Sequence, residues 1–362
     1  MKKIYLAGFF LLLSLHSFGQ GINFIYNDIR QAFNLARTQH KMVFVEVYSK
    51  GCSHCATFEP IFKEKTVGDY YNQNFISYRL EVSSDDVRNF LTPKKIFGPS
   101  LPLFLYFDSN ETLQHFAISN AAAAELIKHG QNALVPAARA ANYRNRYAAG
   151  ERENNFLFDL AMYCRVVCDT PLNVKIMEEY AKRTPVANYA DKTNWLVVQK
   201  LVMDVDNPLA QHLINNYAVY QKKYDPKEVK FAAENLLMSS LYSSRGNQYN
   251  ATKIQNIRKG LVKIGIEAGS ANARTLLPEV NYYFRNRQTA QATTRANEYL
   301  NGAKAQIGDY KYIVGLFNQK ATDKSYVPML TKWVSKGLTL TTPNSPDAQV
   351  LKQELAKAQA RK

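Results

Sequence analysis

The chain has no long hydrophobic run and few cysteines, tryptophans or histidines. Its 362 residues include four cysteines, two tryptophans and six histidines. The longest apolar stretch, from Ile4 to Leu15, is too short for a bilayer, which needs about 20 residues. We also find no glycine loop followed by the lysine and serine or threonine that cradle a phosphate. These absences argue against a membrane-spanning protein and against a P-loop nucleotide enzyme.

The short apolar stretch instead predicts a secretory signal. It follows two lysines at the start of the chain and precedes Ser17-Phe18-Gly19, small residues of the kind that a signal peptidase reads. We expect residues 1–19 to be a signal peptide, with cleavage between Gly19 and Gln20. The mature chain is then exported, periplasmic or secreted, in a compartment where disulfides persist.

Basic residues are in excess, and the excess lies in the second part of the chain. The formal net charge is +16, yet residues 20–120 contain ten basic and ten acidic residues. A basic surface can favour acidic partners or anionic envelope surfaces. The basic residues of 121–362 are dispersed among acidic ones, with no block longer than pairs such as Lys222-Lys223. We therefore expect a solvated basic face and no nucleic-acid partner.

The motif Cys52-Ser53-His54-Cys55 is the most informative feature present. The preceding residues 42–48 predict a buried strand, because they are rich in β-branched and aromatic side chains. The following residues 56–65 suit a helix. Cys52 is therefore expected at a helix N-terminus, where the free N–H groups favour a thiolate. The motif alone is also compatible with a metal knuckle or a structural disulfide.

Helix and strand patterns alternate over the first part of the chain. This order predicts crossover connections around a central sheet, which is an α/β class. The expected helices are 27–41, 56–65, 69–73, 85–90 and 120–134, and the expected strands are 42–48, 75–82, 101–107 and 112–118.

From about Val135 only helical patterns remain, with short breaks that carry turn and capping residues. Consecutive helices joined in this way pack as antiparallel hairpins. The stretch from Leu330 to Leu355 resembles a tetratricopeptide unit, and no period persists through the whole region. The expected helices are 155–168, 171–183, 191–204, 207–223, 225–244, 250–268, 272–287, 289–302, 309–320, 323–338 and 345–360.

The first part of the chain resembles the thioredoxin superfamily over about residues 22–120. Residues 45–48 lead into Cys52 in the manner of protein disulfide isomerase domains, and Glu46 lies six residues before that cysteine. Residues 100–108 look like the family's cis-proline strand, with Pro102 as the proline. The resemblance implies a thioredoxin-like domain with a central mixed sheet over 20–134, followed by an all-helical, tetratricopeptide-like array over 135–362.

The resemblance also implies roles for individual side chains. Cys52 is the exposed nucleophile, and Cys55 is the buried thiol that resolves the mixed disulfide. Glu46 exchanges the proton of Cys55. His54, when protonated, stabilises the Cys52 thiolate and so favours an oxidant or isomerase over a strong reductant. The backbone at Pro102 faces the thiols and pairs with an extended substrate.

Three residues depart from the family pattern. Gly51 replaces the usual tryptophan before the first cysteine, Ser53 replaces a common glycine, and Ala56 replaces a frequent lysine. These changes keep both thiols, the acid and the proline. They therefore affect the expected substrate preference rather than the redox chemistry.

Zinc or copper binding by Cys52, His54 and Cys55 is the first competing interpretation. A zinc site needs four tetrahedral ligands, and no second pair lies nearby in the sequence. Cys164 and Cys168 form a separate pair, four residues apart, which a helix would place on one face. They could be buried small hydrophobes, a disulfide at a helix end, a soft-metal pair, or thiols that exchange with Cys52.

Two functional hypotheses follow. The first is an exported thiol–disulfide oxidoreductase that acts on protein thiols and disulfides, with a helical part that recruits a client or partner protein. Its redox centre is the Cys52–Cys55 disulfide, and no other cofactor or metal is expected. The second is a non-catalytic envelope interaction protein that uses the thioredoxin-like domain as a scaffold.

Overall fold

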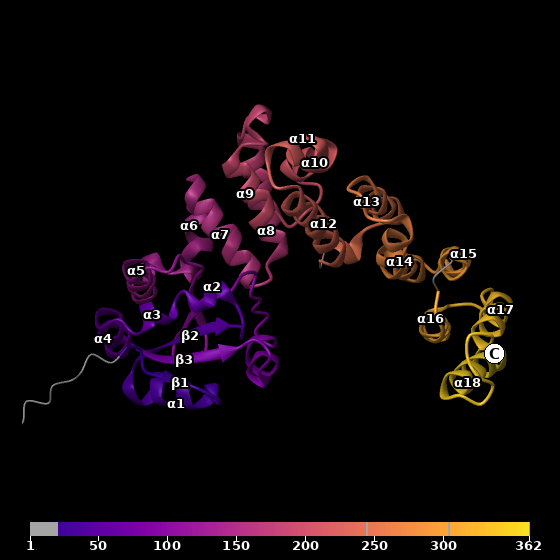
Figure 1. Ribbon diagram of the computed structural model, residues 1–362, viewed down its shortest axis with the longest axis horizontal. Helices are drawn as coiled ribbons and strands as arrows, with labels where there is room; N and C mark the ends of the chain where they lie inside the picture. Colours follow the sequence, from indigo (N-terminus) through magenta and orange to yellow (C-terminus); the bar gives the residue numbers. More distant parts are fainter. Residues whose placement is uncertain (1–20, 244, 303–304, 362) are drawn as a thin grey trace, which may run out of the picture. The chain divides into compact units, whose positions relative to one another are not determined.

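The structure is a computed structural model that describes residues 21–243, 245–302 and 305–361 (Figure 1). The predicted signal peptide lies outside these residues. The chain divides into two compact units, one ending at Cys168 and the other beginning at Asp169. Each unit is described by itself.

The first unit alternates strands and helices. Its elements are β1 (Phe24–Ile25), α1 (Ile29–Gln39), β2 (Met42–Tyr48), α2 (Ser53–Ala56), α3 (Glu59–Phe62), α4 (Lys65–Asn74), β3 (Phe75–Glu81), the π-helical turn η1 (Val87–Leu91), β4 (Leu103–Phe107), β5 (Leu113–Ala117), α5 (Ala123–Leu134), the 3₁₀ turns η2 (Pro136–Ala138) and η3 (Ala140–Asn142), α6 (Tyr143–Ala148) and α7 (Asn154–Val166).

The strands form one mixed sheet in the order β1-β3-β2-β4-β5. Strands β1, β3 and β2 are parallel, whereas β4 runs antiparallel to both β2 and β5. Parallel strands of one sheet need crossover connections. Helix α1 lies between β1 and β2 in the chain, and α2, α3 and α4 lie between β2 and its neighbour β3. The sheet and its flanking helices, followed by helices alone, confirm the predicted fold class.

Aromatic side chains fill both faces of the sheet. On one face, Phe104 of β4 packs against Phe58 with ring centroids 5.0 Å apart. On the other face, Phe107 of the same strand meets Phe33 of α1 at 5.9 Å. Successive side chains of a strand point to opposite faces of the sheet, so one face packs against α1 and the other against the segment that carries the cysteines. Figure 1 shows α1 on one side of the sheet and α2 and α3 on the other.

The first unit extends beyond the predicted boundary at residue 134. The Ala140 backbone N–H donates to Nδ1 of His115 in β5, at 3.1 Å. Tyr163 of α7 lies 5.8 Å from Phe116 of the same strand, measured between ring centroids. These contacts attach η3 and α7 to the edge of the sheet. Residues 135–168 contain helices and no strand, but they belong to the sheet-containing unit and not to the helical part that was predicted to begin at residue 135.

Several local elements differ from the predicted ones. The segment after Cys52 forms the three helices α2, α3 and α4 where two were predicted, over 56–65 and 69–73. The last of them, α4, includes Thr66-Val67-Gly68, where the sequence predicted a break. Buried Val67 and Tyr71 supply a helical apolar face that outweighs the cost of Gly68. The strand β1 has only two residues, too short for a pattern to reveal.

The second unit is helical throughout. Its elements are α8 (Thr170–Arg183), η4 (Val186–Asn188), α9 (Lys192–Lys200), α10 (Pro208–Asn215), α11 (Tyr217–Lys223), α12 (Pro226–Tyr242), η5 (Gly246–Gln248), α13 (Ala251–Lys263), α14 (Ala268–Arg285), α15 (Thr289–Leu300), α16 (Ile307–Lys320), α17 (Val327–Leu338) and α18 (Pro346–Ala360).

At several of the predicted breaks, a polar side chain caps the N-terminus of the helix that follows. Asp169, Asp225 and Ser345 each accept a hydrogen bond from a backbone N–H of the first turn. Several predicted helix boundaries differ from the observed ones, and two have a clear local cause. The expected helix 207–223 is divided at Asn216, whose side chain bonds to a backbone carbonyl. Gly265, at φ +82°, lies beyond the end of α13, before α14 begins.

Two ion pairs to one buried glutamate join three helices of this unit. Glu279 of α14 is enclosed, and its Oε2 lies 2.6 Å from Nε of Arg295 in α15 and 2.7 Å from Nη1 of Arg258 in α13. A buried charge is tolerated only when it is paired in this way.

Among the residues that the structure describes, none of the helices combines the length and the apolar character that a membrane span requires.

We predict that the sheet-containing unit loses stability in acid through His115. Burial, with smaller contributions from His129 and Arg139, lowers the pKa of His115 to about 3. The unfolded chain binds a proton at this histidine below about pH 6.5, whereas the folded chain does so only near pH 3. The free energy of unfolding is therefore highest above about pH 6.5 and decreases as the pH falls toward 3. Between pH 6.5 and pH 5 the wild type should lose about 2 kcal/mol more than His115→Gln.

Protection of the 103–117 amides against hydrogen exchange at both pH values measures this difference. Tryptophan fluorescence does not, because Trp195 and Trp333 both lie in the second unit. Equal losses in the two proteins would contradict the prediction.

Candidate functional site

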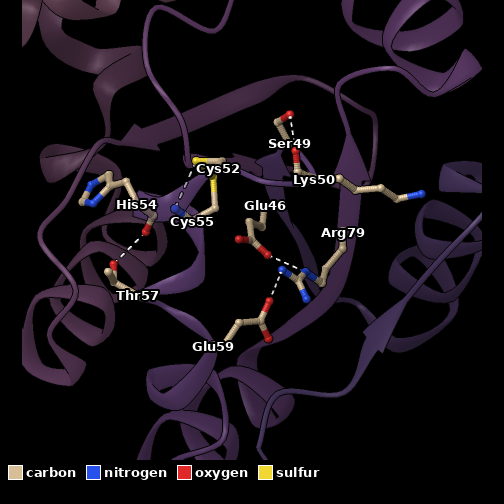
Figure 2. The surroundings of a disulfide bond; sticks show 9 residues. All are labelled: Glu46, Ser49, Lys50, Cys52, His54, Cys55, Thr57, Glu59 and Arg79. Atoms are coloured by element: carbon tan, nitrogen blue, oxygen red, sulfur yellow. Dashed lines mark hydrogen bonds and ion pairs between the residues drawn. A yellow bond between two sulfur atoms is a disulfide. The ribbon is translucent and has the colours of Figure 1, made fainter.

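The two cysteines of the motif form a disulfide at the junction of β2 and α2 (Figure 2). Their Cα atoms lie 5.3 Å apart. Cys52 is the N-cap of α2, and its Sγ accepts a hydrogen bond from the Cys55 backbone N–H at 3.1 Å. Gly51 makes the turn from the strand with φ +80°, a conformation that favours glycine. The predicted position of Cys52 at a helix N-terminus is confirmed.

The two sulfur-bearing residues differ in exposure. Cys52 is half-buried, whereas Cys55 is 4% exposed and faces the core. A group approaching from solvent can therefore reach Cys52 more readily than Cys55. This asymmetry is what separates an attacking thiol from a resolving one.

Glu46 lies within the sheet, on the face that the thiol-bearing helices cover. It is the fifth residue of β2, directly opposite Phe104 of β4 and beside Arg79 of β3. Phe104 in turn packs against Phe58, three residues after Cys55. The Glu46 side chain is fully buried. Its carboxyl group is therefore enclosed between the sheet and the helices that carry the disulfide.

Burial raises the pKa of the Glu46 carboxyl to about 7, against the opposing effect of Arg79. Nε of Arg79 lies 2.6 Å from Oε2 of Glu46, which makes an ion pair. The N–H is not directed at the carboxylate, so within the described part of the chain neither carboxylate oxygen has a well-aligned hydrogen bond. A carboxyl group held this way can change protonation state close to neutral pH.

Arg79 contacts a second carboxylate at its other end. Its Nη2 lies 2.6 Å from Oε1 of Glu59, the first residue of α3. The guanidinium carbon also lies 4.5 Å from the centre of the Tyr48 ring. Figure 2 shows Arg79 between Glu46 and Glu59. The arginine thus bridges a buried acid and one that is 43% exposed.

His54 lies on the surface of the motif. Its side chain is exposed, and its ring lies edge-on to Phe58 with centroids 5.7 Å apart. Its backbone carbonyl accepts a hydrogen bond from Oγ1 of Thr57 at 2.7 Å. The expected effect of His54 on Cys52 stays a prediction.

The Leu101–Pro102 peptide bond is cis, as the sequence predicted. Leu103 then begins β4 and pairs with Val47 of β2. Val47 is the last residue but one of β2, which ends at Tyr48 before the turn that leads to Cys52. The preceding loop is attached to α7, because the Phe97 backbone N–H donates to the Val166 carbonyl at 2.8 Å. Pro102 and the disulfide therefore lie at the same end of the sheet.

Cys164 and Cys168 do not form a disulfide. Cys164 is fully buried within α7, whereas Cys168 is exposed and follows the helix in a left-handed conformation, at φ 54°. The prediction that one helical face carries both is wrong, because α7 ends at Val166. Burial raises the pKa of the Cys168 thiol, and the nearby Lys95 charge opposes that rise.

Arg79 and Glu59 were not predicted from the sequence as site residues. Arg79 was assigned only as part of an alternating strand, and Glu59 as part of a helix. A signal was present, because an arginine within a predicted strand of the central sheet needs a counter-charge. The parallel register of β2 and β3 makes Glu46 that partner.

Within the described ranges, no three or more histidine, cysteine, aspartate or glutamate side chains gather in a metal-binding arrangement.

Comparisons with known proteins gave structural similarity but no match of sequence. No family model and no curated protein matches the chain. A solved structure, the disulphide isomerase from Xylella fastidiosa Temecula1, is similar at 14% sequence identity and a TM-score of 0.23. The match covers 30% of this chain and 87% of that one.

We predict that the four cysteines react in a fixed order. Native protein without reductant should show one titratable thiol, Cys168, because Cys164 is inaccessible and the other two are joined. Mild reduction should add Cys52 first, and unfolding should add Cys164. Alkylation followed by peptide mass spectrometry measures this order. Modification of Cys55 ahead of Cys52 would contradict the exposures of the two residues.

Proposed function

We propose that this protein is a thiol–disulfide oxidoreductase that exchanges disulfides with protein thiols through Cys52 and Cys55. One observation carries the proposal: the disulfide joins an accessible sulfur to a buried one, above a buried carboxyl group whose pKa is near neutrality. A purely structural disulfide requires neither unequal exposure of its two cysteines nor a buried carboxyl group such as that of Glu46.

In the oxidising direction, a client thiolate attacks Sγ of Cys52 and forms a mixed disulfide. The Cys52–Cys55 bond breaks, and its electron pair goes to Cys55, which takes up a proton. A second client thiolate then attacks the client sulfur of the mixed disulfide and releases Cys52 as a thiolate. The client loses two electrons and two protons, and the cysteine pair gains the electrons.

Glu46 is the proposed proton partner of Cys55. A thiol buried from solvent exchanges its proton slowly unless an acid or base lies nearby. Since burial holds the pKa of Glu46 at about 7, both of its protonation states are populated near neutral pH. It can therefore protonate the departing Cys55 in one direction and deprotonate it in the other.

His54 and the N-terminus of α2 both favour a thiolate at Cys52. A stabilised thiolate makes the disulfide a better oxidant. We therefore favour an oxidant or isomerase over a strong reductant. Export follows in the proposal from the predicted signal, and the helical unit from Asp169 onward is proposed to recruit the client or a partner protein.

Activity on a protein disulfide is the first test. Wild-type protein should accelerate insulin reduction by a small thiol, or the oxidative refolding of a reduced client, whereas Cys52→Ser should give the uncatalysed rate because it lacks the attacking sulfur. The matched control is Cys168→Ser, which removes an exposed thiol outside the motif and should retain full activity. Equal rates for wild type and Cys52→Ser would favour the scaffold hypothesis.

Trapping is the second test. Cys55→Ser cannot resolve a mixed disulfide, so clients should accumulate as covalent adducts of Cys52. Adducts are detected as bands that disappear on reduction and are identified by mass spectrometry. The double variant Cys52→Ser/Cys55→Ser should give none. Adducts that persist in this double variant would show that another thiol forms them.

A further inference from the structure

We propose that Glu59 is a positioning residue for proton exchange at Cys55, because it holds Arg79 between two carboxylates and so limits the charge that Arg79 directs at Glu46. This inference rests on the proposed function. Glu59 itself touches neither sulfur nor client in the proposed reaction; it acts through the arginine.

The geometry places one guanidinium between two acids. Nε of Arg79 lies 2.6 Å from Glu46, and Nη2 lies 2.6 Å from Glu59. The exposed fraction of the three side chains rises along this series, from 0% for Glu46 through 12% for Arg79 to 43% for Glu59. The series thus runs from the enclosed site toward solvent.

The backbone fixes both ends of the series. Glu46 and Arg79 lie opposite each other in neighbouring strands, so their Cα atoms are held in register. Glu59 is the first residue of α3 and precedes Pro60, on the same short segment as Cys55. The rings of Phe24, Tyr48 and Phe62 surround the guanidinium, with its central carbon 4.5 to 5.7 Å from their centres.

Because Arg79 also pairs with Glu59, its positive charge stabilises the ionised form of Glu46 less than it would alone. An undivided positive charge at this distance would hold Glu46 ionised, because an opposite charge strongly favours the carboxylate in a buried site. Glu59 draws part of that charge and adds a negative charge of its own, which further raises the pKa of Glu46. Glu46 consequently stays able to accept and return a proton near pH 7.

The step that depends on this is resolution of the mixed disulfide. Glu46 takes the proton of the Cys55 thiol, and the Cys55 thiolate attacks Sγ of Cys52. The new Cys52–Cys55 bond forms as the bond to the client sulfur breaks, and the client leaves as a thiolate with that electron pair. The proton then passes from Glu46 to solvent, so charge and electrons balance.

Single-turnover reaction with Ellman's reagent tests the inference. Reduced protein should release one thionitrobenzoate when Cys52 attacks and a second when Cys55 resolves the adduct. The variants are made in a Cys168→Ser background, because that exposed thiol would add to the signal. The rate of the second phase is followed from pH 5 to pH 9 for the parent, Glu46→Gln, Glu59→Gln and Glu64→Gln.

We expect the parent's second phase to rise through an inflection near pH 7 that is absent in Glu46→Gln. In Glu59→Gln the inflection should move to lower pH by roughly one unit. The plateau at high pH should also be lower, because a weaker base removes the proton more slowly. Glu64→Gln makes the same charge change at an exposed residue nearby and should match the parent.

A Glu59→Gln profile that coincides with the parent's, or that moves to higher pH, overturns the inference. A parent without a second phase overturns the proposed function instead. In that case the ¹³C carboxyl resonance of Glu46, identified by its absence in Glu46→Gln, is titrated in the oxidised proteins. A lower midpoint in Glu59→Gln than in the parent supports the coupling, and an unchanged one refutes it.

Discussion

The fold of the first unit encloses an acid on the face of the sheet that the disulfide-bearing segment covers, and the rest of the site depends on that burial. Removing the Glu46 carboxyl from water opposes its ionisation, and Arg79 compensates only in part. An aromatic core lies around this arrangement. Phe44, Phe58 and Phe104 pack on the same face and hold β2, β4 and the thiol segment together.

The unequal exposure of the two cysteines follows from the same packing. Phe58 anchors the segment after the motif against the sheet, which turns Cys55 inward and leaves Cys52 at the first turn of α2. The loop before Pro102 reaches the same end of the sheet because β4 runs antiparallel to β2. Its attachment to α7 explains why residues after the sheet belong to this unit.

The sequence predicted what depends on local pattern and missed what depends on pairing between strands. The strand 42–48, the helix start at Cys52 and the cis bond before Pro102 follow from alternation, capping and a recognisable motif, and all three are confirmed. Arg79 and Glu59 were missed because their roles arise only when β3 pairs with β2. The boundary after Cys168 was missed for a similar reason: α7 is an ordinary helix locally, and only its contacts assign it. The tetratricopeptide-like character of the second unit stays a prediction.

The central claim is that Cys52 and Cys55 form a redox-active pair rather than a structural staple. The most direct test is the reduction potential of the native protein, measured by equilibration in defined thiol–disulfide buffers followed by rapid alkylation and mass analysis. The account predicts reversible opening and closing of this one disulfide, with the fold intact, at a potential above roughly −300 mV, the region below which structural disulfides lie. A disulfide that resists reduction until the protein unfolds would contradict it.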